Sequence, residues 1–229
     1  MSLKKAHFFS IPMAQIIPNK TPKIIKQLFP NYTWDLYTDN EKKLYLTFDD
    51  GPIPDVTEFV LTQLNQYNAK ATFFCIGDNI RKHPEVFKQI LSEGHTIGNH
   101  TMNHLKAWKT SLDTYINNTI DCQNLIRKHS PNEDIQQIFR PPYGQISQTK
   151  FKALEKLGYK IILWDVLSKD WEQTISPEEC LQNVIQNTQQ GSIIVFHDSI
   201  KASKNLTAVL PEVLDYFTKR GYVFDTIRF

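Results

Sequence analysis

Several features are scarce or missing in the sequence, and each absence narrows the class of protein. The 229 residues include three cysteines, none in a C-x-x-C pair, which argues against a disulfide-stabilised mini-fold and fits no zinc knuckle. No apolar run approaches the roughly 18 residues that a membrane-spanning helix needs. Charge is nearly balanced, with 26 Lys and Arg against 24 Asp and Glu, so a nucleic-acid partner held by phosphate neutralisation is not indicated.

A clear secretory leader is also missing. No A-x-A-like cleavage site follows the partly apolar N-terminal stretch, which is interrupted at His7, Ser10, Pro12 and Gln15. This favours a cytoplasmic location over a secreted or periplasmic one, although a removed leader would leave the same sequence and the compartment stays open. Hydrophobic residues make up 41% of the chain and aromatic residues 12%, which is ample for a buried core and argues against disorder.

From residue 43 onward, short β-branched and aromatic runs alternate with amphipathic stretches of helical period. The predicted strands span 43–48, 71–75, 96–99, 137–139, 160–165, 192–197 and 222–226. The predicted helices span 55–67, 84–93, 111–129, 148–157, 177–188 and 205–219. This alternation favours an α/β protein with a parallel sheet, either open and doubly wound or closed into a barrel. We expect one domain over 43–229, with residues 1–42 as an N-terminal extension that packs on it.

Polar clusters stand at the ends of the predicted strands, where α/β folds place their sites. Asp49 and Asp50 follow the first strand, and two adjacent carboxylates in one loop need a cation or a proton to offset their repulsion. An ordinary acidic turn is the alternative. His100 and His104 are four residues apart, so one helical turn would bring both imidazoles to one face, a spacing that a metal ion can use. Either histidine alone would be interpreted as a capped or solvated residue.

Three further clusters complete the set. Arg140 begins an Arg-Pro-Pro-Tyr-Gly turn, in which its guanidinium can orient a carboxylate and the rigid turn can aim a backbone N–H outward. A plain proline-rich loop is the alternative there. Asp170 and Trp171 lie in an acidic loop. His197 ends an apolar strand, a place that usually holds a satisfied core histidine unless a partner such as Asp170 raises its pKa.

Read together, the five clusters resemble the motifs of the polysaccharide deacetylases of the NodB-homology type, carbohydrate esterase family 4. The matching segments are Thr-Phe-Asp-Asp-Gly-Pro at 47–52, His-Thr-x-x-His at 100–104, Arg-Pro-Pro-Tyr-Gly at 140–144, Asp-Trp at 170–171 and Val-x-His at 195–197. The resemblance covers residues 43–228 and implies a distorted (β/α) barrel with about seven parallel strands. Leu167 stands where many members carry a further Asp, and Val195 replaces the usual Leu; both departures bear on substrate preference.

The resemblance implies a metal-dependent hydrolase that removes N-acetyl or O-acetyl groups from a carbohydrate such as a chito-oligosaccharide, peptidoglycan or xylan. Asp50, His100 and His104 would bind one divalent metal, with Zn²⁺ implied first and Co²⁺ or Ni²⁺ as alternatives. A water activated by this metal would lose its proton to Asp49, the general base.

The remaining implied roles belong to groups around this centre. Arg140 would hold the Asp49 carboxylate, and the backbone N–H of Tyr143 would stabilise the oxyanion. His197 would protonate the leaving amine while Asp170 keeps the imidazole oriented and charged. The implied substrate contacts are Trp171, Val195, Tyr143 and Pro142.

Two other functions stay open at this point. Relatives of this fold act on small amides or cyclic imides, which would replace the carbohydrate by a small molecule. A catalytically silent glycan-binding module is the second alternative, and it is disfavoured because base, metal ligands and acid are all present. The expected partner is thus an acetylated carbohydrate, and the sequence does not determine the oligomeric state.

Overall fold

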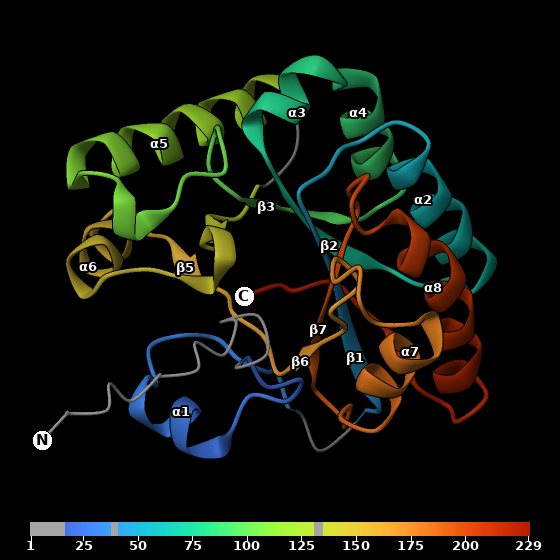
Figure 1. The fold of residues 1–229 in the computed structure, drawn as a ribbon. Helices are drawn as coiled ribbons and strands as arrows, with labels where there is room; N and C mark the ends of the chain where they lie inside the picture. Colours follow the sequence, from blue (N-terminus) through green and yellow to red (C-terminus); the bar gives the residue numbers. More distant parts are fainter. Residues whose placement is uncertain (1–16, 38–40, 131–134) are drawn as a thin grey trace, which may run out of the picture.

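The computed structural model describes residues 17–37, 41–130 and 135–229. At its centre lies a parallel sheet with the strand order β5-β4-β3-β2-β1-β7-β6, and β8 pairs with the start of β1. The sheet curls into a half-barrel, which confirms the predicted fold class (Figure 1). The strands are β1 (Lys43–Asp49), β2 (Ala71–Cys75), β3 (Thr96–Asn99), β4 (Ile138–Phe139), β5 (Lys160–Ile161), β6 (Val166–Leu167), β7 (Ile193–His197) and β8 (Val223–Phe224).

Helices surround the curled sheet (Figure 1). They are α1 (Lys23–Leu28), α2 (Val56–Gln66), α3 (Gly77–Lys82), α4 (Pro84–Ser92), α5 (Leu112–His129), α6 (Gln148–Lys156), α7 (Pro177–Ile185) and α8 (Ser203–Thr218), with 3-10 turns η2 (Ala107–Lys109) and η3 (Pro142–Gly144). Local signals fix some of their ends: Ser176 and Glu179 form a capping box at the start of α7. Within the described part of the chain, no helix combines the length and the apolar character needed to cross a membrane.

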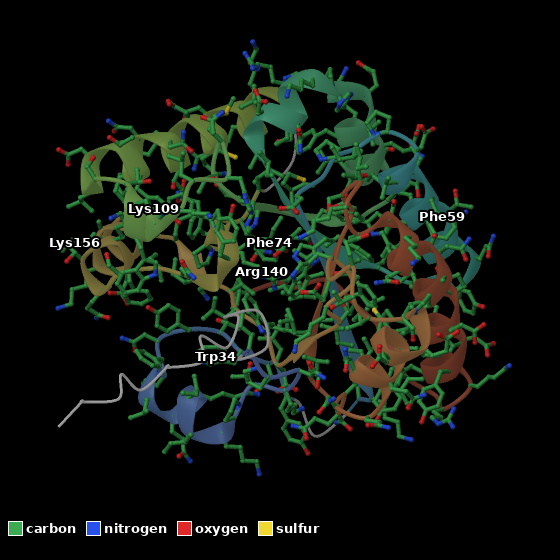
Figure 2. All side chains as sticks on the ribbon, viewed as in Figure 1. Trp34, Phe59, Phe74, Lys109, Arg140 and Lys156 are labelled. Atoms are coloured by element: carbon green, nitrogen blue, oxygen red, sulfur yellow. The ribbon has the colours of Figure 1, made fainter. Side chains whose placement is uncertain are left out.

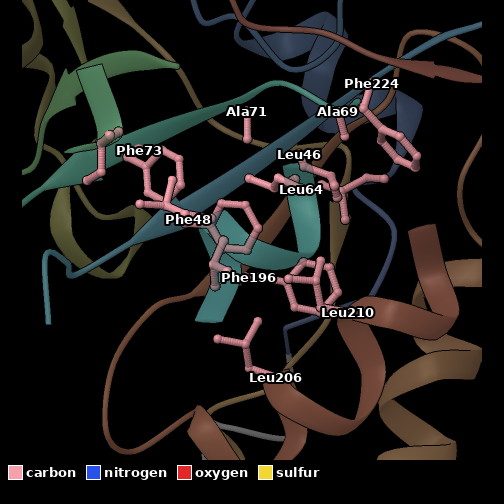
Figure 3. Close-up of a cluster of buried hydrophobic side chains, with 14 of the residues drawn as sticks. Leu46, Phe48, Leu64, Ala69, Ala71, Phe73, Phe196, Leu206, Leu210 and Phe224 are labelled. Atoms are coloured by element: carbon pink, nitrogen blue, oxygen red, sulfur yellow. The ribbon is translucent and has the colours of Figure 1, made fainter. Parts of the chain in front are cut away.

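The main hydrophobic core lies between the sheet and the helices that cover it. The Phe48 ring centroid is 5.1 Å from that of Phe73 and 6.2 Å from that of Phe196, and Leu206 and Leu210 of α8 belong to the same cluster (Figure 3). Because β1 is buried on both faces, its sequence is a nearly continuous apolar run rather than an alternation. The acidic residue of this strand, Asp49, is its last residue and so lies at the carboxyl edge of the sheet.

Residues 17–37, called here the bridging segment, lie between β5 and β6, the two outermost strands of the sheet. Isolated bridges pair Lys20 with Val166 of β6, Thr33 with Ile162 just after β5, and Asp35 with Ser192. The bridging segment thus spans a break that the short half-barrel leaves open. The division of the chain at residue 42 into an extension and a domain stays a prediction.

A buried carboxylate anchors the bridging segment to the sheet. Asp165 is fully buried and forms ion pairs with Lys20 Nζ and Lys26 Nζ, each at 2.5 Å. It also accepts a hydrogen bond from the Ser192 hydroxyl. Removing this carboxylate would take away the anion shared by two ammonium groups and the acceptor of a buried hydroxyl, leaving Lys20 with the Asn187 carbonyl and Lys26 with Asp35. Such a loss costs more than the pair itself contributes, because the remaining charges stay partly desolvated.

We expect Asp165→Ala to lower the free energy of unfolding by about 3 kcal/mol, measured by urea denaturation. The control is Asp215→Ala, which breaks the exposed Asp215–Lys219 pair on α8 and is expected to cost less than about 1 kcal/mol. Equal losses in the two variants would contradict the anchoring role of Asp165.

The predicted strand over 160–165 is wrong in its extent. Within this range the strand β5 covers Lys160 and Ile161, and after a break the next strand, β6, begins at Val166, beyond the predicted end. The break arises because the carbonyls of Ile162 and Leu163 accept hydrogen bonds from the Arg140 side chain, at 3.3 and 3.0 Å. The Leu163 N–H meanwhile donates to Thr33 of the bridging segment. Hydrogen bonds to the Arg140 side chain and to the bridging segment thus occupy backbone groups that would otherwise pair with a neighbouring strand. The helices α1 and α3 and the strand β6 were not predicted from the sequence.

Candidate active site

Loops at the carboxyl ends of the parallel strands converge on one edge of the sheet. Asp49 and His197 are the last residues of β1 and β7, and the two are partners in the strand register. His100 directly follows β3, Arg140 directly follows β4, and Asp170 lies in the loop after β6. Parallel pairing therefore gathers residues that are far apart in the sequence, on the edge where α/β proteins bind their ligands.

Asp50, His100 and His104 form a group that could hold a metal ion. Their candidate ligand atoms all lie within 4.8 Å of one another. Asp50 Oδ1 lies 3.7 Å from His100 Nε2 and 3.3 Å from His104 Nε2. This oxygen is buried and has no hydrogen-bond partner in the described part of the chain. A buried carboxylate oxygen that lacks a donor and faces two imidazole nitrogens fits a divalent cation, and these three ligands suit zinc.

The two histidines meet on a loop, so the predicted helical turn is wrong. Residues 100–104 are not helical, and Thr101 (φ 66°) and His104 (φ 54°) both have left-handed backbones. The Leu105 N–H donates to Thr101 Oγ1 at 3.3 Å, which fixes the loop locally. The imidazole centroids of His100 and His104 are nevertheless only 5.0 Å apart. Two left-handed residues turn the chain sharply enough to replace the helical turn.

Both imidazoles are arranged as metal ligands require. His100 Nδ1 lies 2.7 Å from the Arg140 carbonyl oxygen, so Nδ1 carries the proton and the lone pair of Nε2 faces Asp50. Burial, and then repulsion by His100, lowers the pKa of His104 to about 4. His104 is therefore neutral at pH 7, the form in which histidine binds metals.

Asp49 is set apart from Asp50 by a different partner. Arg140 Nη1 donates to Asp49 Oδ1 and to Thr47 Oγ1, both at 2.7 Å, and the Arg140 side chain is completely buried. The guanidinium carbon lies 4.1 Å from the centre of the Phe74 ring, and the two residues are neighbours in the middle of the molecule (Figure 2). Burial alone would raise the pKa of Asp49, but the charge and hydrogen bond of Arg140, together with the charges of His100 and His197, outweigh it and lower that pKa. Asp49 is thus an ionised carboxylate at neutral pH.

His197 is paired with Asp170. Its Nδ1 lies 2.8 Å from Asp170 Oδ1, and its backbone N–H donates to Asp170 Oδ2 at 2.7 Å. Burial by itself would lower the pKa of His197, but the charge and hydrogen bond of Asp170 dominate and raise it to about 9. Trp171 contacts the imidazole edge-on, with ring centroids 4.7 Å apart. The imidazole is therefore fixed in orientation and protonated at pH 7.

Tyr143 lies at the rim of the group. Its backbone is left-handed (φ 61°), its side chain is 48% exposed, and its ring centroid is 4.6 Å from that of His104. The next residue is glycine because a Cβ there would lie 2.3 Å from the Trp164 ring. Pro142 and Val195 are both buried, so their contact with a substrate stays a prediction.

One buried acid next to the site was missed. Asp198 is fully buried, accepts a hydrogen bond from the Gly51 N–H at 2.9 Å and another from Thr57 Oγ1 at 2.7 Å. Burial raises its pKa to about 8. The only signal in the sequence is its position directly after His197, which by itself does not separate a solvated acid from a buried one.

Comparison with known proteins places this geometry in a family. Residues 37–162 match the family model described as polysaccharide deacetylase. A peptidoglycan-N-acetylglucosamine deacetylase of Bacillus cereus is 38% identical over 206 residues, covering 88% of this chain and 94% of that protein. A chitooligosaccharide deacetylase of Azorhizobium caulinodans is 34% identical over 161 residues, covering 70% of this chain and 76% of that protein.

A solved structure agrees with the sequence relatives. The crystal structure of the Bc1960 peptidoglycan N-acetylglucosamine deacetylase, in complex with 4-naphthalen-1-yl-N-oxidanyl-benzamide, superposes with a TM-score of 0.81 at 31% identity. The match covers 90% of this chain and 95% of that one. With the motif residues gathered at one edge of the same half-barrel, the chain belongs to the polysaccharide deacetylase family.

Proposed function

We propose that this chain is a metal-dependent deacetylase that hydrolyses the N-acetyl group of an amino sugar in peptidoglycan or in a chito-oligosaccharide. The observation that carries the proposal is the orphaned Asp50 Oδ1, which faces two imidazoles in the same loop cluster as an Arg-paired carboxylate and an Asp-paired imidazole. The names of the relatives support the substrate class, because both describe removal of groups from acetylated amino sugars or their oligomers.

Asp50, His100 and His104 would hold the metal, which, when bound, supplies Lewis acidity toward the acetyl carbonyl and the attacking water. Asp49 takes the proton of that water. Because Arg140 occupies Oδ1 of Asp49, the proton goes to Oδ2. Arg140 keeps the carboxylate ionised and in place, so two adjacent acids take different roles through different partners.

His197 completes the hydrolysis as general acid. Since its Nδ1 is bonded to Asp170, Nε2 is the atom that donates the proton to the leaving nitrogen. The backbone N–H of Tyr143 stabilises the charge that develops on the carbonyl oxygen. The exposed Tyr143 ring and Trp171 provide aromatic surfaces for the sugar.

The pH dependence of kcat/KM tests the acid. His197 acts in its protonated form, so kcat/KM should be level below its pKa of about 9 and fall above it by about tenfold per pH unit. Asp170→Asn keeps the shape but removes the charge that raises this pKa, so the alkaline limb should move to lower pH, because burial then acts on His197 without that charge. Exposed Asp121→Asn is the control and should leave the limb near pH 9. An unmoved limb in Asp170→Asn would remove His197 as the titrating acid.

The substrate is tested by acetate release. Protein stripped of metal and reloaded with Zn²⁺, Co²⁺ or Ni²⁺ would be assayed on a chito-oligosaccharide, a peptidoglycan fragment, an O-acetylated xylan and a small free amide. We expect acetate from the first two substrates, only in the metal-loaded samples. Turnover of the free amide alone would favour the small-molecule alternative, and glycan binding without turnover in a metal-loaded sample would favour the binding module.

A further inference from the structure

We infer that Asp198 is a positioning residue that holds Asp50 in the conformation in which it binds the metal, an inference that rests on the proposed function. Asp198 does not itself offer a ligand atom. Both oxygens of its carboxyl group already accept hydrogen bonds from the protein, from the Gly51 N–H and from the Thr57 hydroxyl. Asp198 acts instead on the backbone that carries Asp50.

The backbone of Asp50 needs such support. Its φ of 86° lies in the left-handed region, which a residue with a Cβ adopts at a cost of about 1–3 kcal/mol and keeps only when its surroundings impose it. Three hydrogen bonds impose it here. The Asp50 N–H donates to the Phe74 carbonyl at 3.3 Å, Asn79 Nδ2 donates to the Asp50 carbonyl at 2.7 Å, and the Gly51 N–H donates to Asp198 Oδ1 at 2.9 Å.

Of these three contacts, the one to Asp198 links the metal site to the rest of the catalytic edge. The Asp198 N–H donates to the carbonyl oxygen of Asp49 at 3.1 Å. Its Oδ2 accepts from Thr57 Oγ1, which in turn accepts the Ile53 N–H at 2.8 Å. The side chain of Asp198 therefore holds the residue after the metal ligand and the start of α2, while its backbone N–H holds Asp49.

The approach of Asp198 to this loop is close enough to determine a neighbouring residue. A Cβ built at Gly51 would lie 1.9 Å from Asp198 Oδ2 and 2.5 Å from its Cγ. Any side chain at position 51 would therefore have to displace the buried carboxylate. The glycine of the Asp-Asp-Gly-Pro motif is accordingly explained by the carboxylate of Asp198, which lies on a different strand end.

The test is metal affinity, measured by titrating metal-free protein with Zn²⁺ in a calorimeter and by the visible absorption spectrum of the Co²⁺-loaded protein. We expect Asp198→Ala to weaken Zn²⁺ binding by about 10–100-fold, the usual effect of removing a group that orients a ligand. Asp198→Asn keeps an oxygen that can accept from Gly51 and should restore binding to within about tenfold of the unsubstituted protein. A residue needed only for folding would not give altered cobalt absorption in a variant that is fully folded.

Thr57→Val is a second variant for the same Zn²⁺-binding measurement, and its result does not depend on whether Asp198→Ala folds. It removes the donor to Oδ2 and should weaken Zn²⁺ binding by about tenfold, whereas Thr62→Val, at an exposed position of the same helix, should change nothing. Unchanged Zn²⁺ affinity in folded Asp198→Ala, or in Thr57→Val if Asp198→Ala does not fold, would overturn the inference. If the unsubstituted protein binds no metal and releases no acetate, the proposed function fails and this inference fails with it. If the unsubstituted protein binds metal and releases acetate, and the variants bind Zn²⁺ with the same affinity as it does, only the inference fails.

Discussion

Asp49→Asn is expected to lower kcat on an acetylated amino sugar by about 10²–10⁴-fold while bound metal stays at the level of the unsubstituted protein. The amide has nearly the shape of the carboxylate and can still accept from Arg140, which donates to Asp49 Oδ1 at 2.7 Å. It has lost the basic oxygen that takes the water's proton. The metal ligands Asp50, His100 and His104 are untouched, so the loss should fall on turnover and not on metal content.

Two measurements separate this role from a structural one. Metal content by atomic absorption should remain unchanged in Asp49→Asn but fall in Asp50→Ala, in which one of the three ligands is missing. Exposed Asp121→Asn serves as the matched control and should keep full turnover. Near-normal turnover in Asp49→Asn would remove Asp49 as the base.

Arg140→Met is expected to lower the free energy of unfolding by about 3–5 kcal/mol, because it leaves the Asp49 carboxylate buried without its cation. The guanidinium also donates to Thr47 and to two backbone carbonyls, and these acceptors would lose their donors inside the protein. Turnover should fall as well, since the pKa of Asp49 is no longer held down by Arg140. Urea denaturation and acetate release measure the two effects.

Arg140→Lys keeps a positive charge but not the planar fork, so it should recover part of the stability and less of the turnover. Arg127→Met changes an exposed arginine on α5 by the same number of atoms and should cost less than about 0.5 kcal/mol. A loss in Arg140→Met as small as in Arg127→Met would contradict the central role of the buried guanidinium.

The sequence was enough to predict the parts of the molecule that depend on local pattern. Nearly continuous apolar runs marked the buried strands, and the motif residues fell at strand ends, so the parallel sheet had to gather Asp49, His100 and His197 on one edge. The sequence indicates a functional role for His197 only if Asp170 lies nearby. The structure places Asp170 Oδ1 2.8 Å from His197 Nδ1.

What could not be predicted depends on contacts between distant segments. The strand expected over 160–165 is broken because Arg140 and Thr33 bind its backbone groups, and neither contact leaves a trace in the local sequence. The spacing of His100 and His104 was interpreted as a helical turn, whereas two left-handed residues give the same proximity. Asp198 was missed because its burial follows from its packing against Gly51 and Thr57.

The bridging segment also covers the outer strands of the sheet, where a strand of another protein chain could otherwise pair. A sheet that stops short of closure ends in strands whose outer N–H and C=O groups can recruit a strand from another molecule, the first step of aggregation. Here the Leu167 N–H donates to the Asn19 carbonyl and the Thr33 N–H to the Ile161 carbonyl, so both ends of the sheet are already paired within the chain. The half-barrel thereby obtains the protection against intermolecular β-pairing that a complete barrel has by closure.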